Sequence, residues 1–242
     1  MTKAYINNWS DKDVEKHWDS VADIYIEENN KVKNAHDQRF VESIQYLFLS
    51  NGSKVLNITS RDCEANDYLE KQNRNVSVVN AEISKKLIDE AQKVRPYVKQ
   101  VKLKNYSQLP FNDGEFDEIL SLETLEHVKE PVQFLKELHR VSKSKSRLVL
   151  SCPPATSEIP YQVYTALFGG HGEGPHKFPS SKEVKKCLNY LVGNCLFIKV
   201  LCLFRLAPAW LQKWGEKIIN RFQGTFIAEL GIRQFYVCEK YR

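Results

Sequence analysis

The sequence predicts an α/β protein whose sheet is mostly parallel. The clearest evidence is an apolar segment of strand length at 116–122, an amphipathic helix at 131–141 and a second apolar strand at 147–152. A polar turn is expected at 142–146, between the helix and the second strand. Strand, helix and strand at this spacing form a βαβ unit, in which the strands are parallel and the crossover is right-handed. The 242 residues, 42% of them hydrophobic, suffice for such a domain with its own core.

The rest of the chain continues the alternation of helices and strands. Helical spacing of apolar residues, the Asn51-Gly52 turn signal and a capping serine at 180 or 181 set the boundaries. The other predicted helices are 14–28, 38–48, 64–71, 84–93, 182–190 and 209–222, and the other predicted strands are 54–58, 76–79, 98–103, 195–206 and 233–239. We expect one domain over 1–242, with a helical cover at 1–48.

Three short motifs surround the strand at 116–122. Leu109-Pro110-Phe111 precedes it, Phe116-Asp117 begins it and Leu125-Glu126-His127 follows it, and Pro153 ends the next strand. None is specific alone, but their order and spacing make residues 18–154 resemble a class I S-adenosylmethionine-dependent methyltransferase domain. The resemblance implies a Rossmann-like, doubly wound, mostly parallel sheet of seven strands, with a reversed final strand and helices on both faces. It also implies S-adenosylmethionine as the cofactor.

The turn after the first strand departs from this family pattern. Relatives place an acid at the strand end and glycines at three alternate positions, because the backbone approaches the cofactor closely there. Here Asn57 replaces the acid, and Thr59, Arg61 and Cys63 replace the glycines. Two interpretations remain. The turn either still binds the cofactor along a wider path, with Ser60 and backbone groups as donors, or the site has decayed or changed its ligand.

The resemblance assigns further residues to the cofactor. Tyr25, in the segment HWDSVADIY, would lie near the methionine end. Glu82, after the second strand, would accept hydrogen bonds from the ribose hydroxyls, although an acid there also suits a helix N-terminus. Asn105 would contact the adenine amino group, or else it is a surface-turn asparagine. The full cofactor-binding set is Tyr25, Asn57, Thr59, Ser60, Glu82, Ile83, Asn105, Tyr106, Leu122 and His127.

An insertion at 155–181 follows the strand that ends at Cys152. Its aromatic residues, histidines and glycines predict an ordered, mobile lid over the acceptor side; a glycine-rich connector with packed aromatics is the alternative. Methyl transfer needs a base only if the acceptor must lose a proton. The catalytic candidates for that role are His127, His171 and His176, and we expect His176 to point into the acceptor pocket.

A second insertion, 208–224, is amphipathic. Trp210, Trp214 and Phe222 recur at helical spacing with basic residues around them. They would form an exposed apolar face that gives peripheral membrane contact, meets a lipid-linked acceptor or forms a homodimer. The alternative is a helix packed against the protein's own core.

Composition narrows the classes of function. A net charge of +5 without a concentrated basic stripe argues against nucleic acid as a partner. The six cysteines form no Cys-x-x-Cys pair, so we expect reduced thiols, no metal site and a cytoplasmic protein. The sequence therefore predicts methyl transfer from S-adenosylmethionine to a small-molecule, sugar or lipid-linked acceptor. The alternative is an inactive methyltransferase-like binding or partner protein that has lost the glycine-rich loop.

Overall fold

A seven-stranded sheet organises the computed structural model, with strand order β3-β2-β1-β4-β5-β7-β6. The structure describes residues 6–72, 75–168, 172–191, 193–201 and 225–240, together with 210, 214–215, 217–218 and 221–222. The strands are β1 (Lys54–Ile58), β2 (Ser77–Glu82), β3 (Gln100–Lys102), β4 (Phe116–Leu122), β5 (Ser142–Cys152), β6 (Gly193–Leu201) and β7 (Arg233–Lys240). All are parallel except β7, which runs antiparallel to its neighbours β5 and β6.

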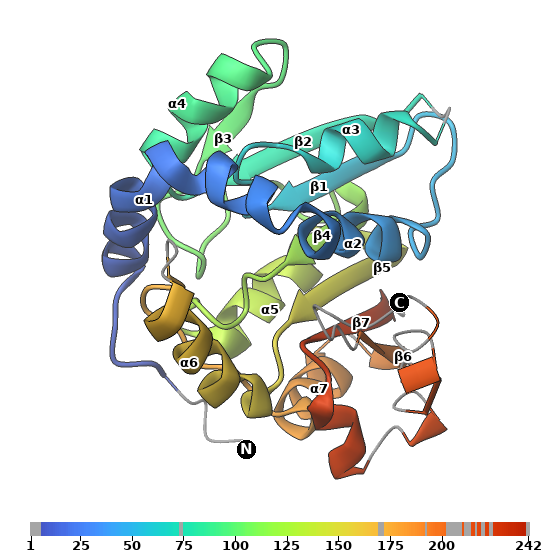
Figure 1. Cartoon of the computed structure of the whole chain (residues 1–242). Coiled ribbons are helices and arrows are strands. Elements are labelled where there is room, and N and C mark those ends of the chain that lie inside the picture. The colour runs from blue at the N-terminus through green and yellow to red at the C-terminus, as the bar shows by residue number, and fades with distance from the viewer. Residues whose placement is uncertain are drawn as a thin grey trace.

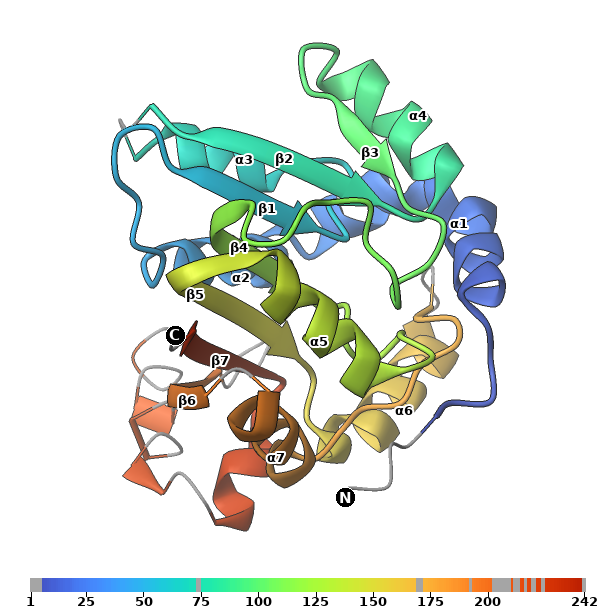
Figure 2. The same ribbon diagram turned by 180° about the vertical axis from the view of Figure 1, so that it is seen from behind.

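Helices cover both faces of this sheet, as predicted (Figures 1 and 2). They are α1 (Asp11–Lys31), α2 (Lys33–Ile44), α3 (Ala65–Glu70), α4 (Lys85–Val94), α5 (Pro131–Val141), α6 (Glu158–Phe168) and α7 (Ser181–Leu191), with short 3-10 turns η1 (Ala155–Ser157) and η2 (Phe226–Leu230). None of these helices is long and apolar enough to cross a membrane.

The core consists of two layers because successive strand residues point to opposite faces. Ile119 joins the cluster formed with α5 and α7, whereas its neighbour Leu120 joins the cluster formed with α2 and α3. The same alternation places Leu56 on the first face and Val55 on the second. Strand sequences that are apolar throughout are thus explained by burial on both sides.

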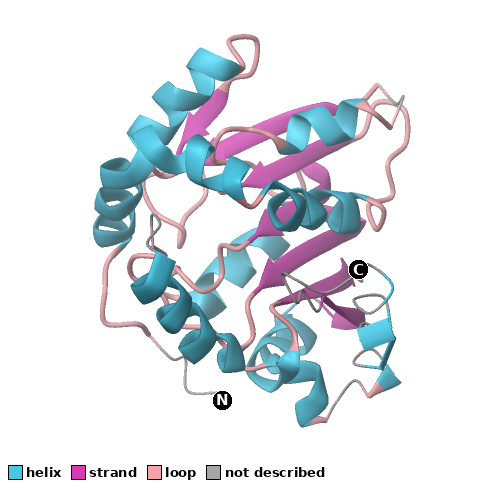
Figure 3. Ribbon diagram, in the orientation of Figure 1, coloured by secondary structure: helices cyan, strands magenta, loops and turns pink. Residues whose placement is uncertain are grey.

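The order of the strands reverses at β1. This strand pairs in parallel with β2 on one side and with β4 on the other. In open parallel sheets, the crevice beyond the carboxyl ends of the strands at such a reversal is where ligands bind. Figure 3 shows α1 and α6 lying beyond the arrowheads of these parallel strands.

Helix α1 is fixed at that edge by its sequence. Ser10 and Asp13 form a reciprocal capping box at its start, and the buried residues recur every three or four positions: Val14, Trp18, Ala22 and Tyr25. The helix is longer than the predicted 14–28 at both ends. Helix α2 begins five residues before the predicted start at 38, directly after the α1 cap at Val32.

Two local predictions are wrong. The polar turn expected at 142–146 belongs to β5, since Ser142 pairs with Phe116 and the register then shifts before Arg147 pairs with Glu118. Lys143 reaches Asp117 at 2.8 Å, so the polar sequence reflects an exposed strand end. In the lid, the predicted loop begins as η1 and α6, and among its described residues before α7 only 172–180 is irregular.

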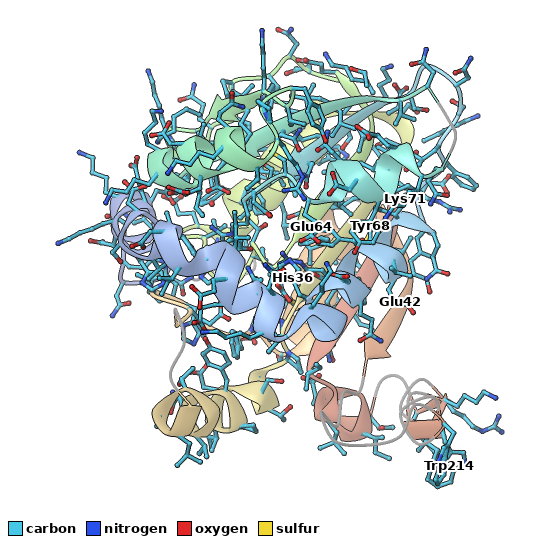
Figure 4. All side chains as sticks on the ribbon, turned by 45° about the horizontal axis from the view of Figure 1, so that its top comes forward. His36, Glu42, Glu64, Tyr68, Lys71 and Trp214 are labelled. Carbon is cyan, nitrogen blue, oxygen red and sulfur yellow. The ribbon has the colours of Figure 1, made fainter. Side chains whose placement is uncertain are left out.

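The described part of the 208–224 insertion is exposed. Trp210, Trp214 and Phe222 are 69%, 60% and 44% exposed, respectively. A helix buried against the protein's own core is therefore excluded at these three side chains. Figure 4 shows Trp214 projecting away from the rest of the molecule.

Candidate active site

The turn after β1, here called the cradle loop (residues 59–64), keeps a glycine-type backbone without glycine. Thr59, Arg61 and Cys63 have φ values of 60°, 51° and 64°. These are the same three positions that relatives fill with glycine. A non-glycine residue in the left-handed region costs about 1–2 kcal/mol, so the surrounding structure must impose this path.

Hydrogen bonds from three other segments impose the path. The amide of Ser60 donates to the Ala81 carbonyl on β2 at 3.0 Å. The Gln100 side chain donates to the Arg61 carbonyl and to Ser60 Oγ, each at 2.8 Å. Arg95 donates to the Asp62 carbonyl at 2.8 Å. The loop is thus tied to both β2 and β3 rather than left free.

Glu82 lies at the end of β2, facing the cradle loop. Its carboxylate is fully buried. Oε2 accepts from the Arg61 amide at 2.9 Å, and Oε1 accepts from the amides of Ile83 and Ser84 at 2.8 and 3.0 Å. Three backbone donors fix the carboxylate in direction, which suits a group that recognises a pair of hydroxyls.

The side chain of Arg61 fills the space in front of Glu82. Its guanidinium carbon lies 3.6 Å from the centroid of the Trp18 ring, and Nη1 lies 3.7 Å from Glu82 Oε1. The same charge acts on the hydroxyls of Tyr25 and Tyr106. The guanidinium therefore lies among residues expected to bind the cofactor, and nothing in the spacing of the sequence revealed that its side chain would turn inward.

The other expected cofactor residues divide into two groups. Tyr106 is buried with its hydroxyl 3.4 Å from Thr59 Oγ1, and Leu122 ends β4 at the same edge. By contrast, the Asn57 amide donates sideways to Asn80 at 2.8 Å. Asn105 accepts from the Gln108 amide at 2.8 Å, which closes a turn. The structure thus brings the first group to the cradle loop and engages the second within the protein.

A second turn, the acceptor loop (residues 123–130), follows β4 at the same edge. Glu123 has φ 52° and is paired with Arg39 at 2.9 Å and with Arg233. Burial would raise the pKa of Glu123, but the guanidinium groups of Arg233 and Arg39 outweigh it and lower this pKa to about 2. Sequence analysis missed this triad, because its members come from α2, the acceptor loop and β7.

Glu126 stands in contrast to Glu123. It is 1% exposed, and neither carboxyl oxygen has a hydrogen-bond partner elsewhere among the described residues. Burial raises the pKa of Glu126 well above its ordinary value, and the nearby charges of Glu123 and Glu173 raise it further. The LEH motif therefore contributes a buried acid as well as a histidine.

His127 connects the cofactor side to the lid. Its ring centroid lies 5.6 Å from that of Trp18 and 6.5 Å from that of His176. Nδ1 lies 3.1 Å from the Pro175 carbonyl, and Nε2 lies 3.5 Å from Glu173. The neighbouring Glu126 carbonyl accepts from the Lys177 amide at 2.9 Å, so the lid is bonded directly to the acceptor loop.

His176 lies on the inner side of the lid, largely buried. Nδ1 is 2.8 Å from the Gly174 carbonyl, Nε2 is 3.1 Å from Glu158 on α6, and the ring lies 4.7 Å from Phe178. The structure therefore brings His176 and His127 into one cluster. His171 lies outside the described residues.

The lid also touches α1 over the site. Gly174 has φ 62°, and a Cβ at this position would overlap the imidazole of His17. Glycine is thus required here both for the backbone conformation and for close packing. The contact joins the two segments that cover the sheet edge.

Clusters of metal-binding side chains are absent from the described residues. No three His, Cys, Asp or Glu side chains in the described ranges are arranged to hold a metal ion. A polar cavity of about 310 Å³ lies behind the cradle loop, lined by residues that include His36, Glu64 and Arg95. In its wall, His36 Nε2 lies 2.8 Å from Glu64 Oε2, and the two side chains are neighbours in Figure 4. This cavity lies beside the cradle loop, with Asp62 in its wall, and does not contain Glu82 or Glu126.

Comparison with known proteins assigns the family. Residues 58–150 match the family model described as a methyltransferase domain. The chain carries a class I S-adenosylmethionine-dependent methyltransferase domain. S-adenosylmethionine is the methyl donor of this family, which confirms the predicted cofactor, and the matched residues run from the end of β1 to β5.

Solved structures agree on the fold. A methyltransferase candidate from Haloferax volcanii, in complex with the Trm112 methyltransferase activator, has a TM-score of 0.70 at 12% identity, covering 93% of this chain and 98% of that chain. A SAM-dependent methyltransferase from Thermotoga maritima, with histamine as its candidate acceptor, has a TM-score of 0.62 at 16% identity, covering 93% and 99%. Geranyl diphosphate C-methyltransferase from Streptomyces coelicolor has a TM-score of 0.58 at 12% identity, covering 85% and 76%. No curated protein sequence matches the chain significantly.

Proposed function

We propose that this protein transfers a methyl group from S-adenosylmethionine to a small-molecule or lipid-linked acceptor held beneath the lid. The observation that carries the proposal is the left-handed backbone at Thr59, Arg61 and Cys63. A decayed turn would have no reason to keep three strained residues at the positions where glycine serves cofactor binding. S-adenosylmethionine, when bound, supplies an electrophilic methyl group on a positively charged sulfur.

The residues present fit this cofactor if one side chain moves. Glu82 is oriented by three amides and would bind the ribose, and the cradle loop would follow the methionine portion, with Trp18 and Tyr25 covering it. The guanidinium of Arg61 lies in that space against Glu82. Cofactor binding therefore requires Arg61 to leave the face of Trp18.

The acceptor side would exclude water and position the acceptor. Bonds from Pro175 and Lys177 to the acceptor loop hold the lid closed over the sheet edge. His176, braced by Glu158, and His127 would then be available to take a proton from an acceptor that must lose one. Closure of this kind favours displacement at a charged sulfur, because water is kept away from the reacting atoms.

The exposed face of Trp210, Trp214 and Phe222 would bring the protein to a membrane surface or to a second copy of the chain. Lys217 and Arg221 are exposed on the same segment and would favour an anionic surface. A lipid-linked acceptor could then reach the lid without leaving the membrane.

Calorimetry with S-adenosylhomocysteine, the demethylated cofactor, tests the proposal. We expect saturable binding at one site and a matching rise in thermal stability, about 2.7 kcal/mol at 100 times the dissociation constant. The alternative function, an inactive binding or partner protein, predicts no heat and no stabilisation at millimolar ligand. That result would overturn the proposed function.

A further inference from the structure

The acceptor loop contains a buried acid that the protein itself does not satisfy. Within the described ranges, no other residue donates a hydrogen bond to either oxygen of the Glu126 carboxyl, although the residue is 1% exposed. Burying a polar group without a partner is costly, and burying a charge costs more. Such a group is retained at a site when a ligand completes it.

The position of Glu126 points to the acceptor side. Its pKa is affected by Glu123 in the acceptor loop, Glu173 in the lid and Arg61 in the cradle loop. The Glu126 backbone carbonyl accepts from the Lys177 amide of the lid at 2.9 Å, so the residue lies beside the lid. The thiol of Cys152, at the end of β5, lies close enough for Glu126 to act on it as well.

The charges around this point favour a cation. Glu173 and Glu158 come from the lid, and Glu123 and Glu126 come from the acceptor loop. Arg39 and Arg233 are paired with Glu123, and Arg61 lies against Glu82. A positively charged ligand could form ion pairs with Glu126 and with the acids of the lid.

Aromatic rings complete the surroundings. Tyr161 on α6 lies 6.3 Å from His176 and 6.1 Å from Phe178, between ring centroids, and its hydroxyl bonds Glu173. On the other side, Trp18 packs against His127. Aromatic faces combined with a carboxylate are the chemistry that recognises amines and alkylated ammonium groups.

We propose that Glu126 binds the ammonium group of the acceptor, so that the methyl acceptor is an amine. This inference rests on the proposed function and names its substrate class. Glu126 touches the reacting nitrogen, whereas the aromatic residues and Glu173 enclose it.

The reaction balances without another reactant. The bound ammonium passes one proton to the Glu126 carboxylate, which leaves a neutral amine with a free lone pair. That lone pair forms the new N–C bond while the C–S bond of the sulfonium breaks and its electron pair goes to sulfur. The products are the methylated ammonium and the neutral thioether, with the proton held by Glu126. Burial raises the pKa of Glu126, which makes its carboxylate a better proton acceptor.

Calorimetry on the protein saturated with S-adenosylhomocysteine tests the proposal directly. The probes are phenethylamine and its uncharged analogue 2-phenylethanol, titrated at pH 7. We expect the amine to bind at least about tenfold tighter than the alcohol, because only the amine carries a charge that can pair with Glu126. Equal affinities would overturn the proposal.

Two variants assign the effect to Glu126. Glu126→Gln keeps the shape and should abolish the preference for the amine. Glu118→Gln is the matched control, since Glu118 is also buried with a pKa raised to about 7, but it accepts from the Phe48 amide near the start of β4. The control should bind phenethylamine normally.

The outcomes separate this inference from the proposed function. If S-adenosylhomocysteine binds but the amine does not, the inference fails and the proposed function stands. If Glu126→Gln weakens S-adenosylhomocysteine and leaves the amine unaffected, the carboxylate serves the cofactor's own amino group and the acceptor assignment is wrong. If S-adenosylhomocysteine itself does not bind, the proposed function fails.

Discussion

The cradle loop and the acceptor loop lie at the same edge of the sheet but satisfy their buried polar groups differently. In the cradle loop, Glu82 receives three backbone hydrogen bonds, and Arg61 occupies the space in front of it. In the acceptor loop, Glu126 has no hydrogen-bond partner elsewhere in the part of the chain that the structure describes. The protein thus fills the space in front of Glu82 with its own cation, whereas it leaves the buried acid Glu126 without such a partner.

The largest expected effect concerns Glu82. Glu82→Ala should weaken S-adenosylhomocysteine binding about 100-fold, because each charge-assisted hydrogen bond contributes about 1.5–3 kcal/mol. Calorimetry measures the loss, and circular dichroism checks that the fold remains. Asp89→Ala, on the exposed surface of α4, is the control. Unchanged affinity in Glu82→Ala would mean that this acid is only a helix N-terminal residue.

His176 tests the acceptor side. His176→Ala should reduce methyl transfer to phenethylamine about 100-fold, because the ring helps to position the acceptor and a small misplacement costs about that much, while S-adenosylhomocysteine affinity stays normal. A labelled methyl group measures the transfer. His139→Ala, on α5 away from the lid, should have no effect. If the rate of methyl transfer and the affinity for S-adenosylhomocysteine fall together, His176 supports the fold and does not belong to the acceptor site.

The effects of the Arg61 side chain and of its left-handed backbone can be measured separately with two variants. Arg61→Ala removes the guanidinium from Trp18 and should tighten S-adenosylhomocysteine binding about tenfold, since such a contact contributes up to about 2 kcal/mol. Arg61→Gly should also relieve the left-handed backbone and stabilise the fold by up to about 1 kcal/mol relative to Arg61→Ala. Titration calorimetry and urea unfolding measure the two effects. Weaker binding in both variants would show that Arg61 is itself a cofactor ligand.

The ion pairs of Glu123 should make the stability of the protein depend on pH in the acid range. The folded pKa of Glu123 is about 2, below its ordinary value of 4.5, so its ion pairs stabilise the protein above pH 4.5 and are lost as the pH falls toward 2. Glu123→Gln should therefore flatten the acid limb of the stability curve. Urea unfolding at a series of pH values measures this. An acid limb identical to that of the parent would contradict the triad with Arg39 and Arg233.

The exposed tryptophans should give the smallest change in stability. Replacing Trp210 and Trp214 by serine should shift the free energy of unfolding by less than about 0.5 kcal/mol, as exposed positions do. The same variant should lose binding to anionic lipid vesicles in a sedimentation assay. Val41→Ser, an exposed apolar position on α2, is the control. Vesicle binding that persists in the double variant would contradict membrane contact through these two tryptophans.

Some features of this site could be predicted from sequence and others could not. The βαβ unit at 116–152 and the position of Glu82 follow from strand ends, which are visible in apolar runs. The inward turn of the Arg61 side chain is decided by Trp18 and Glu82, which lie 43 and 21 residues away in the chain. The Arg39–Glu123–Arg233 triad likewise depends on which elements the topology brings together. Local patterns indicate what a residue can do, but tertiary packing decides which partner it meets.

A structure with bound S-adenosylhomocysteine tests the central claim most directly. Crystals soaked with this ligand should show its ribose hydroxyls on Glu82 and the Arg61 guanidinium displaced from the Trp18 ring, while Thr59, Arg61 and Cys63 keep positive φ. Density for the ligand elsewhere, or an Arg61 that remains on Trp18 at saturating ligand, would contradict the account and favour the non-catalytic alternative.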